Sequence, residues 1–197
     1  MVCALLVGAA LMLDGTFAWF TGVDSRVNPL RVPQLVFHVS AVDEFTPPQT
    51  PPTPGGAAIP KRVGATNDGD LRAVVRLLAL PQILAADGET VLPARLGGEV
   101  EADMESLLWV PGGDGYYYWI GVLAPGETTE DLFTEVKLKS GLAETYEGAK
   151  LIIEIKTEAS VASVRDYRLG WWGSESAPTD ATLAQIDGVL SAMVSAP

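Results

Sequence analysis

Residues 149–161, AKLIIEIKTEASV, decide the fold, because their side chains alternate between apolar and polar along the whole stretch. One side carries Leu151, Ile153, Ile155, Thr157, Ala159 and Val161. The other side carries Lys150, Glu154, Lys156 and Glu158, with Ile152 as an apolar exception. Side chains of a β-strand point alternately to its two faces, so a repeat of two residues is typical of a half-buried strand. We therefore expect a long strand with one face in a β-sheet core.

A second β unit lies upstream, at residues 61–80. Residues 61–66 and 71–80 have strand character, and the Asn67-Asp68-Gly69-Asp70 segment between them suits positive φ and a tight turn. In the second strand an apolar side opposes a side that carries Arg72 and Arg76. We expect these arginines to be solvated or to pair with nearby carboxylates. An anion site is the alternative.

Shorter strand patterns fill much of the remaining chain. They lie at residues 35–42, 107–110, 116–123 and 132–138. The turn at 111–115 is expected to join two of them in a hairpin, and residues 124–127 (APGE) fit a type II turn. The aromatic run at 116–119 (YYYW) is expected to serve the core and its rim, with a sugar-binding platform as the alternative. Residues 139–148 are expected to be a linker with one helical turn.

The Pro-rich segment 46–60, TPPQTPPTPGGAAIP, is expected to be an exposed loop within the domain. Proline has no N–H to donate to a sheet, so such a run favours extended loop structure. A Pro-rich recognition ligand is the alternative.

The apolar period changes near the end of the chain. Behind a capping Thr179 or Asp180, apolar residues recur at three and four positions, at Leu183, Ile186, Leu190, Met193 and Val194. This pattern predicts a short C-terminal helix, weakened by Gly188, that lies on the rest of the domain. Seven or more short strands with one terminal helix predict an all-β fold, a two-sheet antiparallel sandwich.

The first residues match an export signal. The apolar run from Ala4 to Leu13 is shorter than the about 20 residues that span a bilayer, and the small residues Thr16 and Ala18 suit a signal peptidase. We expect residues 1–18 to be removed by cleavage between Ala18 and Trp19, which leaves residues 19–197 as a single domain and no stable membrane span. A buried N-terminal helix of a cytosolic domain is the alternative. No basic residue precedes Arg26, so either the true start lies upstream or the signal is weak.

Composition restricts the partners. The chain has 197 residues and a net charge of −12, which argues against binding to nucleic acid or to an anionic membrane surface. The single cysteine, Cys3, lies in the expected signal, so the mature chain would contain neither disulfide nor thiol chemistry.

No catalytic motif is visible. The single histidine, His38, excludes an H-E-x-x-H zinc helix, and the chain has neither a G-x-S-x-G nucleophile turn nor a phosphate-binding glycine loop. His38 is expected to be structural. Glu99, Glu101, Asp103 and Glu105 alternate along one side and would suit Ca²⁺, but they lack a calcium-loop pattern, so a solvated strand edge or short helix is preferred. We therefore assign no catalytic, cofactor-binding or metal-binding residue.

Four stretches in order resemble the TasA/camelysin family of exported matrix and surface proteins. Residues 15–21 (GTFAWFT) are similar to the end of signals cleaved by the SipW-type signal peptidase of Gram-positive bacteria. Residues 61–76 (KRVGATNDGDLRAVVR), 116–138 (YYYWIGVLAPGETTEDLFTEVKL) and 146–159 (YEGAKLIIEIKTEA) are similar to internal family motifs. The chain departs from the family in its missing basic N-terminal region, its Pro-rich loop and Ser160-Val161.

The resemblance implies a jelly-roll-like sandwich, secretion to the biofilm matrix or cell surface, and a non-enzymatic role. It also implies fibres assembled by donor-strand pairing, in which the N-terminal arm of one subunit completes the sheet of the next. Here that arm would be residues 19–28, with Trp19, Phe20 and Val23 as pocket-filling side chains. The expected partners are further copies of the chain, other matrix proteins and a SipW-type signal peptidase.

Two rival functions remain open at this point. Camelysin members have been described as metalloproteases, so a surface metallopeptidase is one alternative. A monomeric surface adhesion module that uses Trp119, Trp171 and Trp172 is the other.

Overall fold

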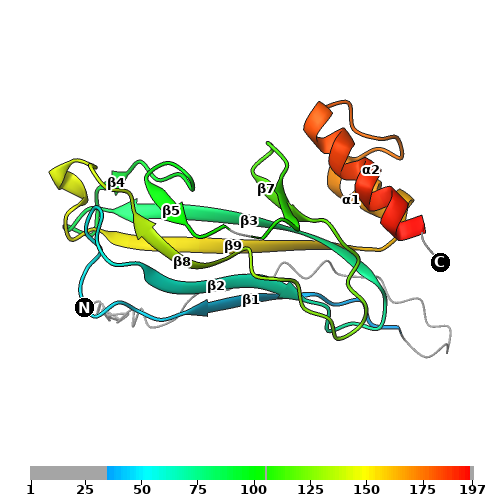
Figure 1. The fold of residues 1–197 in the computed structure, drawn as a ribbon, viewed down its shortest axis with the longest axis horizontal. Coiled ribbons are helices and arrows are strands. Elements are labelled where there is room, and N and C mark those ends of the chain that lie inside the picture. The colour runs from blue at the N-terminus through cyan, green and yellow to red at the C-terminus, as the bar shows by residue number, and fades with distance from the viewer. Residues whose placement is uncertain (1–34, 105, 196–197) are drawn as a thin grey trace, which may run out of the picture.

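The computed structural model describes residues 35–104 and 106–195, which form an elongated sandwich of two antiparallel sheets with two helices at one end (Figure 1). The strands are β1 (Ser40–Phe45), β2 (Ile59–Thr66), β3 (Ala73–Leu84), β4 (Val91–Leu92), β5 (Val100–Ala102), β6 (Trp109–Pro111), β7 (Tyr116–Trp119), β8 (Phe133–Leu138) and β9 (Lys150–Val161). The helical elements are η1 (Glu144–Tyr146), α1 (Val164–Trp172) and α2 (Ala181–Ser195). The predicted all-β sandwich with a short C-terminal helix is confirmed.

The strand order of the two sheets places β9 at an edge. One sheet has the order β1-β2-β8-β5. In the other, β3 pairs with β9 on one side and with β4 and β7 on the other, and β6 lies beyond β7. β3 and β9 pair over their full length, from Ala73 opposite Val161 to Leu84 opposite Lys150. The strand predicted at 149–161 is therefore confirmed, and it lies at the edge of its sheet.

The main core fills the space between the sheets. Odd-numbered side chains of β3, such as Val75 and Leu77, are fully buried there against Val63 of β2 and Phe133 of β8. On β9 the odd-numbered side chains face the same core, as the alternation predicted. Burial of these apolar side chains supplies the main driving force for folding.

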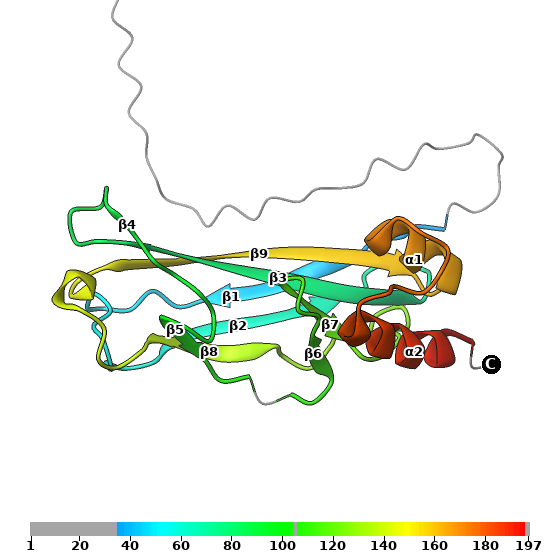
Figure 2. The ribbon, with the colours of Figure 1, turned by 90° about the horizontal axis from the view of Figure 1, so that it is seen from above.

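A second, smaller core lies on the outer face of β3 and β7, under the two helices (Figure 2). Its buried members are Val74, Tyr118, Tyr167, Ile186 and Leu190. Both faces of β3 are consequently buried at this end of the sandwich. None of the helices in the described part of the chain is long and apolar enough to cross a bilayer.

The predicted C-terminal helix is confirmed as α2. Asp180 caps it, because its carboxylate accepts hydrogen bonds from the backbone N–H groups of Thr182 (2.9 Å) and Leu183 (3.0 Å). Helix α1 was not predicted. It ends at Gly173, whose φ of 68° is the left-handed conformation that terminates many helices.

Two turns agree with the predictions. β6 and β7 form the expected hairpin, with Trp109 opposite Trp119. In the 124–127 turn, Gly126 has a φ of 81° and the Glu127 N–H donates to the Ala124 carbonyl at 3.0 Å, as a type II turn requires. The helical turn expected within 139–148 is η1.

Several predicted bounds need correction. The strand predicted at 116–123 is β7, which ends at Trp119. The strand predicted at 35–42 is β1, which begins at Ser40 and ends at Phe45. The preceding segment is held instead by the 67–70 turn. The Asp70 carboxylate accepts a hydrogen bond from the Val36 N–H (2.8 Å), and the Asp70 N–H donates to the Val36 carbonyl (2.7 Å). The Pro-rich loop ends at residue 58, because Ile59, which is buried in the core, and Pro60 already belong to β2.

The 67–70 turn also differs from its prediction. It carries the chain from one sheet to the other, since β2 and β3 do not pair with each other among the described residues. Gly69 does not have a positive φ. A Cβ at Gly69 would lie 2.6 Å from the His38 backbone nitrogen, so the glycine serves a close backbone approach.

Candidate functional site

The site residues predicted at the N-terminus lie outside the described residues. They are the cleavage pair Ala18 and Trp19 and the arm residues Trp19, Phe20 and Val23, within the signal 1–18 and the arm 19–28. The structure therefore bears on them only through the surface that an arm would contact.

The free side of β9 is the candidate assembly surface. Among the described residues, β9 has β3 as its one strand partner. β1, at the edge of the other sheet, contacts β9, and no backbone hydrogen bond joins the two in this part of the chain (Figure 2). A strand edge exposes a row of backbone N–H and C=O groups that another strand can pair with. β9 offers such an edge over twelve residues.

The core is incompletely covered along this edge. The inward side chains Leu151, Ile155 and Ala159 are only partly buried, whereas their neighbours on β3 are buried. The hydroxyl oxygen of Thr157, on the same face, is buried and has no hydrogen-bond partner among the described residues. A buried hydroxyl without a partner is unfavourable, so this face of β9 has unsatisfied apolar and polar surface.

The outward face of β9 is charged. Lys150, Glu154 and Lys156 are exposed on it. Charged side chains on an edge strand discourage indiscriminate pairing with other strands. Any strand that pairs here must therefore match these charges.

A buried ionic cluster fixes the second half of β9 to β3. Arg76, 6% exposed, donates from Nε to Glu158 at 2.8 Å and from Nη1 to the Tyr118 hydroxyl at 2.9 Å. Its guanidinium also lies 3.9 Å from the centre of the Tyr116 ring. Tyr118 in turn donates to Asp114 at 2.7 Å. Pairing of Arg76 with a carboxylate was one of the two predicted roles, and the solvated role is wrong for Arg76, because the helices cover it.

The cluster shifts the pKa values of its members. Burial raises the pKa of Glu158, but hydrogen bonds from Lys156, Tyr116 and Arg76 outweigh burial and lower the pKa to about 2. Burial and the hydrogen bond to Asp114 raise the pKa of Tyr118 to about 12. Glu158 is therefore ionised and Tyr118 neutral over the physiological range, which maintains their hydrogen bonds with Arg76 between β9, β7 and β3.

A second polar clasp joins the two helices. Asp187, which is buried on α2, accepts hydrogen bonds from the Tyr167 hydroxyl (2.9 Å) and from Arg168 Nε (2.8 Å) on α1. Burial alone would raise the pKa of Asp187, and these hydrogen bonds lower it. Neither Asp187 nor its partners were singled out from the sequence.

β1 is attached to the sandwich by a buried lysine. Lys61 of β2 is 5% exposed on the core face, and its ammonium contacts the Asp43 carboxylate of β1. The Lys61 ammonium also lies 5.7 Å from the centre of the Phe45 ring. Nothing in the alternation around Lys61 distinguished it from a solvated lysine.

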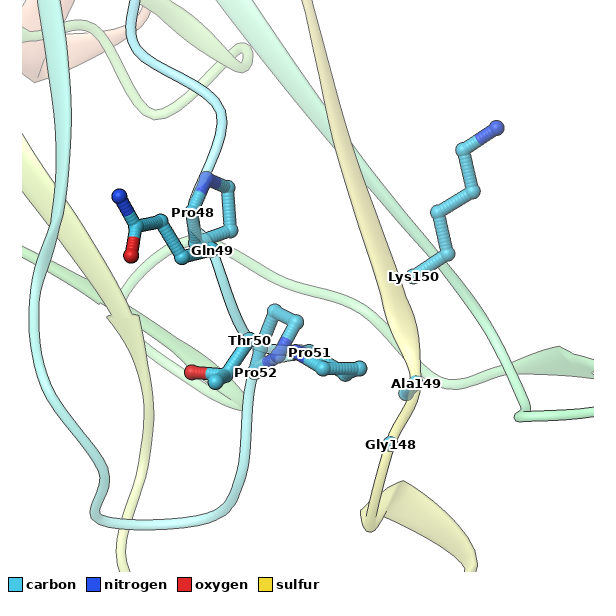
Figure 3. A pocket seen from close by; sticks show the side chains of 8 residues that line it. All are labelled: Pro48, Gln49, Thr50, Pro51, Pro52, Gly148, Ala149 and Lys150. Atoms are coloured by element: carbon cyan, nitrogen blue, oxygen red, sulfur yellow. The ribbon is translucent and has the colours of Figure 1, made fainter.

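A cavity of about 360 Å³ lies at the start of β9 (Figure 3). It is lined by Pro48, Gln49, Thr50, Pro51, Pro52, Gly148, Ala149 and Lys150. The Lys150 side chain points away from the prolines in Figure 3. The Pro-rich loop after β1 thus lies beside the beginning of the free β9 edge.

His38 and the acidic stretch have protein partners. The exposed His38 Nδ1 lies 3.6 Å from Asp68. Asp103 accepts backbone hydrogen bonds from Thr134 (2.7 Å) and Glu135 (2.8 Å), while Glu99 pairs with Arg95 and Glu101 with Lys137. Glu105 lies outside the described residues. Over residues 35–104 and 106–195, no three His, Cys, Asp or Glu side chains are grouped as metal ligands.

The three tryptophans named for adhesion belong to different clusters. Trp119 is buried in the main core, with its ring centre 5.4 Å from that of Trp109. Trp171 and Trp172 lie in the outer cluster around Tyr118 and Tyr167. The structure therefore does not bring Trp119 together with the other two.

Comparison of the chain with known protein families, curated proteins and solved structures gives no match.

Proposed function

We propose that this chain is an exported, non-enzymatic structural protein of the extracellular matrix or cell surface, and that it polymerises. In the polymer, the N-terminal arm of one subunit, residues 19–28, pairs with the free edge of β9 in the next. The partners are further copies of the chain, joined by other matrix proteins, after processing by a SipW-type signal peptidase between Ala18 and Trp19.

One observation carries this proposal: β9 is a twelve-residue edge strand beside an incompletely covered core. A long edge strand without a hydrogen-bonded neighbour can pair with another chain, and the charges on β9 restrict which strand can do so. An incoming strand would satisfy its backbone groups and cover inward side chains such as Ile155 and Ala159 at the same time.

Deletion of residues 19–28 from the mature chain tests assembly. We expect the wild-type chain beginning at Trp19 to form fibres visible by electron microscopy, and the deletion variant to remain a folded monomer with an unchanged β-rich circular dichroism spectrum. Fibres from the deletion variant would refute the proposal. N-terminal sequencing of the exported protein tests the processing step, with Trp19 as the expected first residue.

A further inference from the structure

We infer that the arm binds β9 in one direction and one register: antiparallel, with Asp24 opposite Lys156 and Arg26 opposite Glu154. This inference rests on the proposed function and adds the direction and the register in which the arm pairs with β9. It follows from the alternation of the arm, from where the chain leaves the domain and from the charges on β9.

The arm sequence WFTGVDSRVN has two distinct faces when read as a strand. One face carries Trp19, Thr21, Val23, Ser25 and Val27. The other face carries Phe20, Gly22, Asp24, Arg26 and Asn28. The first face is apolar and small-polar and suits the partly buried inward side chains of β9, such as Ile155 and Ala159. The second face holds both charges of the arm, so it points outward. Phe20 points outward with it, so in this register Trp19 and Val23 face the core of the neighbour and Phe20 does not fill a pocket there.

The direction follows from the two ends of the sandwich. The described chain begins at Leu35, beside the end where β1 starts and β9 finishes (Figure 1). The opposite end carries the Pro-lined cavity, where β9 begins. Subunits stacked head to tail place the cavity end of one against the Leu35 end of its neighbour, and such stacking yields an open filament. The arm then meets β9 at its beginning and extends toward Val161, which makes the two strands antiparallel.

The chain length fits this path. Six residues, the number in 29–34, can reach at most about 20 Å when a chain is fully extended, which sets the largest gap between subunits that this proposal allows. The arm, residues 19–28, spans about 33 Å as a strand, and the twelve residues of β9 span about 40 Å.

Charge then selects the register. A shift of one residue turns the apolar face of the arm outward, so only shifts of two are compatible with the core. In the proposed register Asp24 lies opposite Lys156 and Arg26 opposite Glu154. A shift of two residues in one direction places Asp24 opposite Glu154. A shift of two in the other direction places Asp24 opposite Glu158 and Arg26 opposite Lys156. Like charges directly opposite each other destabilise a strand pair, so both shifted registers are disfavoured.

Glu154 is suited to recognise the arm. It is exposed, and it makes no ion pair with any residue of the described chain. Lys156 is paired with Glu158 in the subunit, yet its side chain is 46% exposed and faces outward. Both charges are thus accessible to a partner strand.

A charge exchange tests the register. Glu154→Lys or Arg26→Glu alone is expected to lower the affinity of subunits for fibre ends roughly fivefold, because an attraction becomes a repulsion. The double variant Glu154→Lys/Arg26→Glu is expected to recover wild-type assembly. Glu147→Lys, an equal charge change at an exposed position before β9, is the control and is expected to assemble normally.

Cysteine trapping tests the direction, since Cys3 is the only natural cysteine and is absent from the mature chain. Arg26→Cys/Glu154→Cys is expected to give a disulfide-linked ladder of subunits on mild oxidation, whereas Gly22→Cys/Glu154→Cys is not. The reverse result would show parallel pairing and overturn the inference.

Failure of the charge exchange to rescue assembly overturns the register. If deletion of residues 19–28 still abolishes fibres, the proposed function survives that failure. Fibres from the deletion variant refute both.

Discussion

At the scale of single residues, Glu158 connects acid sensitivity to the attachment of β9. Its pKa is lowered to about 2 in the folded protein and takes its usual higher value in the unfolded chain. A lowered pKa adds stability above the unfolded pKa, and that stability is lost as pH falls through the folded pKa. The carboxylate therefore contributes near neutral pH, and its contribution declines between about pH 5 and pH 2.

Glu158→Gln is expected to remove this contribution. At pH 7 the variant is expected to be less stable by on the order of 2 kcal/mol, because Arg76 loses its buried counter-ion. The difference from wild type is expected to shrink as pH falls toward 2. Urea denaturation at a series of pH values measures it. A stability difference that is constant with pH would contradict the role given to Glu158.

The sequence predicted some residue roles and missed others for a physical reason. Alternation identified the inward side chains of β3 and β9, since a strand of period two has only two faces. It placed Arg76 on the correct face but did not predict that this face is buried, and it gave no sign that Lys61 is buried. Arg76 is buried because helices far away in the chain cover it, and Lys61 is buried because Asp43 supplies a counter-ion. Such covering is a tertiary property that no local pattern contains.

At the scale of elements, α2 contains a residue that weakens it. Gly188 lies in the middle of the helix and is exposed, and a Cβ there would meet nothing within 4 Å. Gly188→Ala is expected to stabilise the protein by about 0.5–1 kcal/mol, because glycine loses more backbone entropy in a helix than alanine. Thermal unfolding measures the change.

The same substitution at Gly69 is the matched control, with the opposite expected sign. There an added Cβ would lie 2.6 Å from the His38 nitrogen and 2.7 Å from the Val36 carbonyl oxygen. Gly69→Ala is expected to destabilise the protein. Equal effects of the two substitutions would contradict the account of Gly69 as a close-approach residue.

The elements that the sequence missed share a cause. The α1 sequence, VRDYRLGWW, contains Val, Tyr, Trp and Gly residues that are weak helix formers, and the helix is stabilised by burial of Tyr167 against Asp187 and Leu190 of α2. β1 is displaced along the chain because the 67–70 turn binds residues that also have strand character. In both cases a contact with a distant segment outweighed the local preference.

At the scale of the whole molecule, the free edge of β9 has a measurable signature. In the monomer the amides of β3, flanked by strands on both sides, are expected to exchange slowest with solvent. Along β9, every second N–H points away from β3 and is expected to exchange fast. Hydrogen exchange by mass spectrometry on monomer and fibre checks this. Protection that appears on β9 in the fibre supports the assembly surface, and fast exchange retained there contradicts it.

The sequence predicted the fold class, a two-sheet sandwich, but not which strands are neighbours in each sheet. Strand patterns, turns and the capped helix were enough for a two-sheet sandwich. Which strand lies beside which depends on contacts between segments far apart, as between β3 and β9, and local alternation is the same for an edge strand and a central one. The candidate assembly surface is therefore a product of topology.

On the proposed export of the chain, the long separation between β3 and β9 in the sequence sets the order in which the donor and acceptor segments leave the cell. Pairing of segments far apart in the sequence is slow, and Ala73 of β3 cannot pair until Val161 of β9 is available. In a chain that crosses a membrane N-terminus first, the arm emerges at the outset and the edge that receives it emerges last. A product cut short before Lys150 would carry the donor and lack the acceptor. On the proposed assembly, such fragments would cap growing ends and terminate them.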